Sequence, residues 1–166
     1  MSSAYNPAAW SSFFSAQISA SSALTGLIFV AISINLSQIV GRPQLIARCA
    51  KGLTILMGVL LVSTFCMAPG QPVFTLGCEI AVLGAAVWIV ATRTQVTASH
   101  KNPYILRWQK VLHVVLTQFA VLPFIVGGIS LIAQRGGGMY WLLAGVLFSL
   151  VAALADAWVL LIEIQR

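Results

Sequence analysis

Five long apolar segments, each bounded by breaker or charged residues, constrain the fold of this chain more than any other feature. A helix needs about 20 mostly apolar residues to cross the hydrocarbon core of a bilayer, and each segment reaches that length. The segments run approximately over residues 8–40, 44–68, 73–92, 104–133 and 139–164. They predict an all-α integral membrane protein, a bundle of five transmembrane helices that forms a single domain over residues 1–166.

The composition supports a bilayer as the solvent of this chain. Of the 166 residues, 60% are hydrophobic and 7% are charged, and the mean hydropathy is +0.98. A soluble domain carries about 25% charged residues, so a globule of this size would lack the polar surface to cover its apolar residues. The net charge of +6 does not indicate nucleic acid as a partner, because the basic residues sit at the ends of apolar runs.

The first and fourth segments each contain an ambiguity. At over 30 residues the first is longer than a bilayer requires, and we expect one long helix that ends at Gly41-Arg42-Pro43. Alternatively, residues 8–22 lie at the membrane interface, or the whole first segment lies on the surface and four spans remain. In the fourth segment Pro123, Gly127 and Gly128 predict a bend.

The distribution of basic residues predicts the orientation of the bundle. If the N-terminus is outside and the C-terminus is in the cytoplasm, every one of the nine Lys and Arg residues except Arg135 faces the cytoplasm. Cytoplasmic loops carry such an excess of Lys and Arg. The sequence therefore predicts an N-out, C-in bundle, with a bacterial cytoplasmic (inner) membrane as the expected location.

The first segment carries a stripe of small and polar residues. At 100° per residue the following positions fall within about 60° of one another: Ser15, Ser19, Ser22, Gly26, Ser33 and Ser37. Such a stripe predicts either a close helix–helix seam or the wall of a polar pore. Gln17 and Asn35 lie on the opposite side, which favours a helix that is surrounded by protein.

An acidic residue in the last segment is a candidate ion- or proton-handling group. Asp156 shares a helix face with small residues and lies about 12 Å from the cytoplasmic end at helical rise. A carboxylate at that depth needs a partner or water. We expect Lys51 as that partner, with Arg48 and His113 in the same inner third, and the pair is either a static bridge or a functional charge.

Two further titratable residues are candidates for the same role. Glu79 lies about 10 Å below the outer surface and is expected to pair with Arg135, to be protonated or to face a wet cavity. His113 lies one turn inside the fourth segment, where a lone histidine is usually a hydrogen-bonded core residue. Because a haem bound by two histidines would require His100 from a loop, haem is not expected.

The sequence indicates no metal, cofactor or catalytic site. The cysteines Cys49, Cys66 and Cys78 form no C-x-x-C pair and lie far from both histidines, so no zinc site is expected. Cys66 and Cys78 flank one turn at unequal distances, and we do not expect a disulfide between them. The motifs of nucleotide-binding, hydrolytic and metalloprotease sites are absent, so an enzyme has no positive support.

In the number of its spans the chain is similar to the translocator protein family, but the Trp and Pro motifs of that family are not found, and we assign no family. The sequence favours a small homo-oligomeric channel or transporter for an ion or small solute. Asp156, Glu79, Lys51 and His113 are then the ion- or proton-handling candidates. The alternatives are a non-catalytic accessory subunit of a larger membrane complex and a small-ligand-binding protein or intramembrane enzyme.

Overall fold

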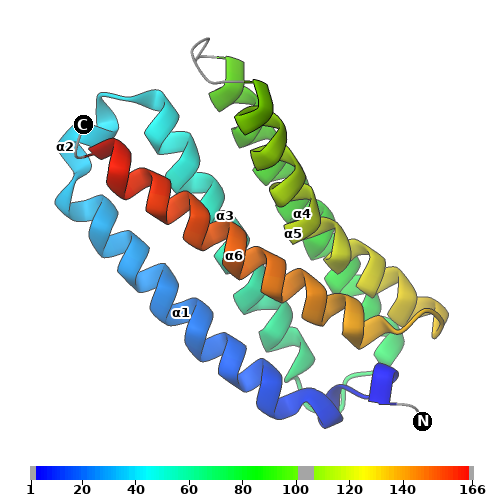
Figure 1. Ribbon diagram of the computed structural model, residues 1–166. Helices are drawn as coiled ribbons and strands as arrows, with labels where there is room; N and C mark the ends of the chain where they lie inside the picture. Colours follow the sequence, from blue (N-terminus) through cyan, green and yellow to red (C-terminus); the bar gives the residue numbers. More distant parts are fainter. Residues whose placement is uncertain (1–2, 101–106, 165–166) are drawn as a thin grey trace.

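The chain is a bundle of helices (Figure 1). The computed structural model describes residues 3–100 and 107–164, apart from the side chains of residues 43–44, 97–100, 107–110, 112–113 and 159–164. Two short 3-10 turns precede six α-helices in this part of the chain. Their bounds are η1 Ser3–Tyr5, η2 Pro7–Trp10, α1 Ser11–Ile34, α2 Leu36–Val40, α3 Pro43–Cys66, α4 Val73–His100, α5 Arg107–Ala133 and α6 Gly138–Ile164.

The helix boundaries follow from local backbone chemistry. Pro43 is the first residue of α3, a position where the missing N–H of proline has no intrahelical partner to lose. Gly70, in the turn between α3 and α4, has a φ of 69°, and Gly136 and Gly137, between α5 and α6, have φ values of 85° and 83°. Glycine adopts this left-handed region without a steric penalty, so these turns reverse the chain within a few residues.

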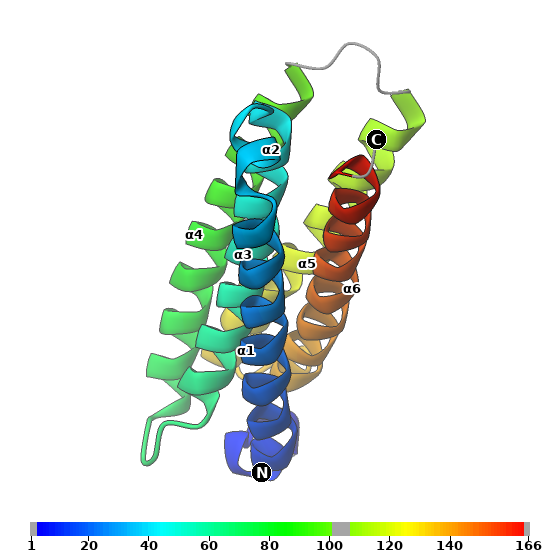
Figure 2. The ribbon, with the colours of Figure 1, turned by 90° about the vertical axis from the view of Figure 1, so that its left-hand side faces the viewer.

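The long helices run alternately up and down, so the chain has two distinct ends (Figures 1 and 2). The N-terminus, the α3–α4 turn and the α5–α6 loop lie at one end, which we call the N-terminal end. There, the backbone N–H of Gly137 donates a hydrogen bond of 2.8 Å to the hydroxyl of Tyr5. Helix α2 and the last turns of α6 lie at the opposite end (Figure 2).

Five helices are long and apolar enough to cross a membrane, which confirms the predicted all-α architecture at this level. The qualifying ranges are Pro7–Ile34, Leu45–Cys66, Val73–Val96, Val114–Ala133 and Gly138–Trp158. They are compatible with a multi-pass membrane protein. The direction of the bundle across a membrane stays a prediction.

The expected single helix over residues 8–40 is wrong at both ends. Residues 7–10 form a 3-10 turn, and Asn35 separates α1 from α2. The Asn35 side chain donates a hydrogen bond of 2.9 Å to the carbonyl of Ala31, so it competes for an acceptor that the backbone uses in a continuous helix. The break thus falls at a residue whose side chain bonds to its own helix.

The third helix is longer than the sequence predicted. We expected it to end at Arg93 and a polar loop to begin at Thr94, but α4 continues to His100. The hydroxyl of Thr94 donates to the carbonyl of Val90 at 3.0 Å, as a threonine can within a helix. Polar composition alone did not end the helix, because no proline or glycine interrupts residues 93–100.

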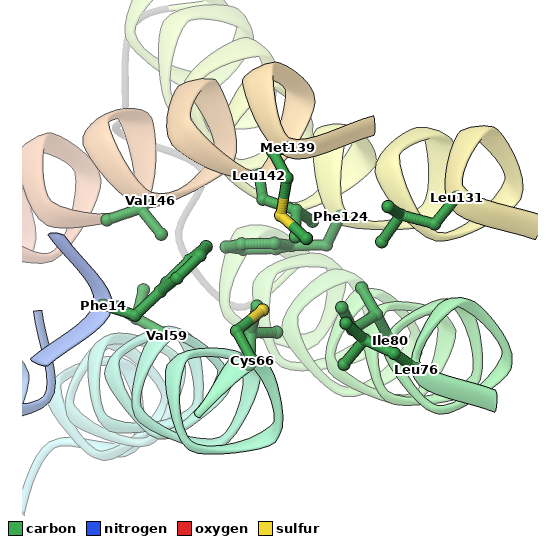
Figure 3. Packing of buried hydrophobic residues seen from close by; sticks show 11 residues of the cluster. Phe14, Val59, Cys66, Leu76, Ile80, Phe124, Leu131, Met139, Leu142 and Val146 are labelled. Carbon is green, nitrogen blue, oxygen red and sulfur yellow. The ribbon is translucent and has the colours of Figure 1, made fainter. Parts of the chain in front are cut away.

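The main hydrophobic core lies toward the N-terminal end and joins all five long helices (Figure 3). Phe14 of α1 and Phe124 of α5 reach its centre, where Phe14 has no exposed surface and Phe124 is 1% exposed. Val59 of α3, Ile80 of α4 and Val146 of α6 pack in the same cluster. Toward the other end, α4 and α5 incline away from α1, α3 and α6 (Figure 1).

Glycines bring α4 and α5 into backbone contact. A Cβ placed on Gly128 would lie 2.7 Å from the backbone nitrogen of Ala81 and 2.8 Å from the carbonyl oxygen of Gly77. A Cβ on Gly77 would lie 2.9 Å from the carbonyl oxygen of Gly128. Only glycine fits at both positions, so this crossing is an example of small residues allowing close helix packing in an apolar solvent.

Helix α1 lies at the margin of the bundle. Only 6% of its most apolar window is buried, compared with 50% for the windows in α3 and α5. It packs mainly on α3 (Figure 2). Most of its surface is therefore available to lipid or to another protein.

Candidate functional site

Lys51 of α3 and Asp156 of α6 form an ion pair inside the bundle. The Nζ atom of Lys51 lies 2.9 Å from Oδ2 of Asp156, and each side chain is 6% exposed. This is the pairing that the sequence predicted. Each charge offsets the cost of burying the other, because an unpaired ion in an apolar interior is strongly destabilising. The role of the pair in handling ions or protons remains a prediction.

Small residues allow α3 and α6 to approach each other at this pair. A Cβ placed on Gly52 would lie 4.0 Å from Cβ of Asp156. On α6, Ala152 and Ala153 are 4% and 1% exposed, and Ser149 is fully buried. The predicted small face of α6 therefore points into the protein and carries Asp156 with it.

A small cavity adjoins the ion pair where α1, α3 and α6 meet. Its volume is about 10 Å³, and its lining includes Ile28 of α1, Arg48 and Cys49 of α3, and Asp156 and Ala157 of α6. That is about the space that one water molecule needs. Arg48 lines the same cavity as Asp156, so a second basic residue lies beside the pair.

Glu79 of α4 has a different partner from the one expected. Its Oε2 atom accepts a hydrogen bond of 2.5 Å from Nε2 of Gln71, which lies in the α3–α4 turn. Arg135 is exposed in the α5–α6 loop, and no ion pair joins it to Glu79 in the part of the chain that the structure describes. Of the three alternatives for Glu79, the Arg135 pair is thus not seen among the described residues, while protonation and a wet cavity stay predictions.

The other candidate charges do not gather at one site. Glu79 hydrogen-bonds to the α3–α4 turn, whereas Lys51 and Asp156 meet between α3 and α6. His113 belongs to α5, and its side chain lies outside the described residues. The structure thus brings together Lys51 and Asp156, with Arg48 beside them, and leaves Glu79 apart.

The six stripe residues, five on α1 and Ser37 on α2, are all exposed in the single chain, and we call them the α1 polar face. They are Ser15, Ser19, Ser22, Gly26, Ser33 and Ser37. The hydroxyl of Ser19 donates to the carbonyl of Ser15 at 3.3 Å, and that of Ser33 to the carbonyl of Phe29 at 2.9 Å. Among the described residues, no other helix of the same chain packs on this face. A helix–helix seam or a polar lining at these positions therefore requires a second chain.

The opposite side of α1 packs against the bundle. Ser21 is fully buried, and its hydroxyl donates a hydrogen bond of 2.7 Å to the carbonyl of Gln17. Gln17, Thr25 and Asn35 are half-buried on this side. The polar residues that hold α1 in the bundle are thus not those of the α1 polar face.

Two polar contacts between helices were not predicted from the sequence. The hydroxyl of Ser149 on α6 donates a buried hydrogen bond of 2.9 Å to the carbonyl of Ala120 on α5. Pro123 has no N–H to donate, so the carbonyl of Phe119, one residue before Ala120, loses its intrahelical donor. The indole of Trp88 on α4 donates to the side-chain oxygen of Gln118 on α5 at 2.7 Å. The proline indicated a bend, but nothing in the sequence identified Ser149 as its neighbour.

The cysteines show no redox or metal-binding arrangement. Cys49, Cys66 and Cys78 are free thiols, and the first two are buried. Among the side chains that the structure describes, no group of three His, Cys, Asp or Glu residues is placed to hold a metal ion. These residues pack as small apolar groups.

Comparison with known proteins adds no family. The chain matches no family model, no curated protein and no solved structure. Its function is therefore argued from the geometry of its own residues.

Proposed function

We propose that this protein is a homo-oligomeric membrane protein that passes an ion or a small solute between its copies, along the α1 polar face. The supporting observation is that all six residues of this face are exposed in the single chain, although five of them lie within an apolar span of 28 residues. Several copies arranged around a common axis would place these hydroxyls along a shared path.

Among the residues that the structure describes, the cavity beside the buried charges is too small for such a path. Near Lys51 and Asp156, the described cavity of about 10 Å³ holds at most about one water molecule. The two charges neutralise each other there. A route between copies thus fits the packing better than a route through a single bundle.

In this proposal the Lys51–Asp156 pair regulates the path from the packed side of α1, opposite the α1 polar face. Ile28 of α1 lines the same small cavity as Asp156, so a change in the charge of the Lys51–Asp156 pair would act on the packed side of α1. Glu79 and His113 remain proposed ion- or proton-handling groups at other depths. The proposed location is a bacterial cytoplasmic membrane, with the N-terminus outside.

Flux measurements with purified protein in liposomes test this function. We expect the wild-type protein to dissipate a potassium or proton gradient, and Ser22→Leu to abolish that flux by placing a bulky apolar group on the α1 polar face. Leu27 is 67% exposed on another side of α1, so Leu27→Ala is the matched control and should conduct as wild type. Asp156→Asn should change the flux. Vesicles that stay tight to every ion tested, with wild-type protein present as an oligomer, would refute the proposal.

A second candidate function uses the same face without transport. The α1 polar face could equally contact a different membrane protein, because it is exposed in the single chain. This chain would then be an accessory subunit. Co-purification of one defined partner at fixed stoichiometry from native membranes, together with tight liposomes, would favour this function.

A further inference from the structure

A second, larger pocket lies at the N-terminal end of the bundle, away from the α1 polar face and from the Lys51–Asp156 pair. It has a volume of about 450 Å³ and lies between the N-terminal 3-10 segment and the α3–α4 turn. Pockets that bind small molecules typically measure about 300–1,000 Å³. Its size therefore suits a small organic ligand, whereas the cavity beside Asp156 does not.

Most of the pocket wall is apolar. Tyr5 contributes from the N-terminal segment, Phe65 and Met67 from the end of α3, and Val73 and Leu76 from the start of α4. The Tyr5 hydroxyl is engaged with the backbone N–H of Gly137 at 2.8 Å, which holds the N-terminal segment in place over the pocket. A ligand that fills this space needs an apolar body.

One acceptor on the pocket wall lacks a partner. Gln71 lines the pocket, and its Oε1 atom is buried without a hydrogen bond among the described residues. Its Nε2 atom donates to Glu79 at 2.5 Å. Because a carboxylate can only accept, the amide must turn its NH₂ group toward Glu79 and its oxygen away. A buried acceptor left in this state costs free energy that a ligand donor would recover.

The charges around the pocket select the type of donor. No Lys, Arg or His side chain is among the lining residues, and Arg135, in the loop at the same end, is exposed. The Glu79 carboxylate lies one hydrogen bond behind the Gln71 amide. This arrangement favours a cationic donor over an anion, because the residue that carries the acceptor is hydrogen-bonded to a carboxylate.

We propose that this pocket binds an amphiphilic amine, with the apolar body against Phe65, Val73 and Leu76 and the ammonium group hydrogen-bonded to Oε1 of Gln71. Such a group can belong to a free amine or to the headgroup of an aminophospholipid, since the pocket lies at the end of the apolar spans. The proposal does not depend on transport, because it uses neither the α1 polar face nor the buried ion pair.

A binding assay on the full-length protein in phosphatidylcholine nanodiscs tests this inference. The probe is radiolabelled phenethylamine, and the competitors are unlabelled phenethylamine, 2-phenylethanol and phenylacetate, which share the ring and differ in charge. We expect saturable binding that phenethylamine displaces, with 2-phenylethanol at least tenfold weaker and phenylacetate inactive. Equal displacement by all three compounds, or no saturable binding, would overturn the proposal.

Two variants locate the binding site. Gln71→Leu removes the acceptor and should weaken binding at least tenfold. Ala68→Trp should fill the pocket while keeping the Gln71 amide and the Glu79 carboxylate, so it tests occupancy of the pocket separately from loss of the acceptor. Ala86 is exposed on α4, and Ala86→Trp is the matched control that should bind as wild type. Unchanged binding by a folded Ala68→Trp protein would place the probe elsewhere and overturn the proposal.

A lipid arm identifies the natural source of the amine. Nanodiscs that contain phosphatidylethanolamine should weaken probe binding if the lipid headgroup occupies the pocket, and should leave it unchanged if a free amine does. Either result supports an ammonium site, provided that Ala68→Trp abolishes probe binding in pure phosphatidylcholine.

Discussion

Lys51 and Asp156 neutralise each other between α3 and α6, with 2.9 Å separating Nζ from Oδ2 and 6% of each side chain exposed. Removing one partner of a buried pair leaves an uncompensated charge, which costs about 3–5 kcal/mol. We therefore expect Lys51→Met and Asp156→Leu each to lower the free energy of unfolding in detergent by about that amount. The measurement is denaturant-induced unfolding of the purified protein.

The double variant Lys51→Met/Asp156→Leu separates pairing from packing. Because no lone charge remains at these two positions, we expect it to recover most of the stability that each single variant loses. A double variant as unstable as the sum of the two single variants would show that the two charges do not stabilise each other.

The contact between Gly77 and Gly128 gives a second prediction. A Cβ on Gly128 would lie 2.7 Å from the backbone nitrogen of Ala81, so Gly128→Ala must push α4 and α5 apart, at a cost of about 1–3 kcal/mol. Gly26 is the control, because nothing lies within 4 Å of a Cβ there. Gly26→Ala should leave the stability of the single chain unchanged or raise it by up to about 1 kcal/mol. Thermal unfolding of both variants in detergent compares them directly.

The hydrogen bond from Ser149 to the carbonyl of Ala120 tests how much a polar contact between helices contributes here. Ser149 is fully buried and its bond measures 2.9 Å. Hydrogen bonds between membrane helices contribute about 0.6 kcal/mol on average and up to about 1.7 kcal/mol, so Ser149→Ala should destabilise the protein within that range. Ser33→Ala, which removes an exposed hydroxyl bonded to its own helix, should have no measurable effect on unfolding.

Much of this fold could be predicted from hydropathy, because the bilayer demands long apolar helices. The pairing of Lys51 with Asp156 could also be predicted, since a sequence with three acidic residues leaves few candidates at matched depth. The exceptions depend on local or tertiary contacts. The helix break falls at Asn35, whose side chain bonds to its own helix. Gln71 contacts Glu79 across a turn, and the hydropathy period does not predict the direction of a turn.

The α1 polar face shows the limit of helical periodicity most clearly. The angular pattern placed its residues on one side of the helix but did not specify which side would pack. The structure packs the side of Ser21 and leaves Ser22 and Gly26 exposed. A small-residue stripe within one chain and a stripe between chains have the same periodicity, so only the packing of the other helices distinguishes them.

Cysteine cross-linking tests whether the α1 polar face meets a second copy. In a background without Cys49, Cys66 and Cys78, we expect oxidation of Ser22→Cys in membranes to give a covalent dimer. Leu27→Cys, on a more exposed side of the same helix (67%), should stay monomeric. Equal cross-linking of both variants would indicate random collision, and no cross-linking of Ser22→Cys would remove the support for an interface at this face.

The two ends of the bundle should lie on opposite sides of the membrane. Arg135 lies in the loop at the N-terminal end, and Gly41 follows α2 at the other end; both are exposed. The excess of Lys and Arg at the Gly41 end predicts that it is cytoplasmic. In intact bacterial spheroplasts that express cysteine-free protein, we expect a membrane-impermeant maleimide to label Arg135→Cys at once and Gly41→Cys only after permeabilisation. The reverse pattern would invert the topology, and immediate labelling at both positions would mean that the helices do not separate two compartments.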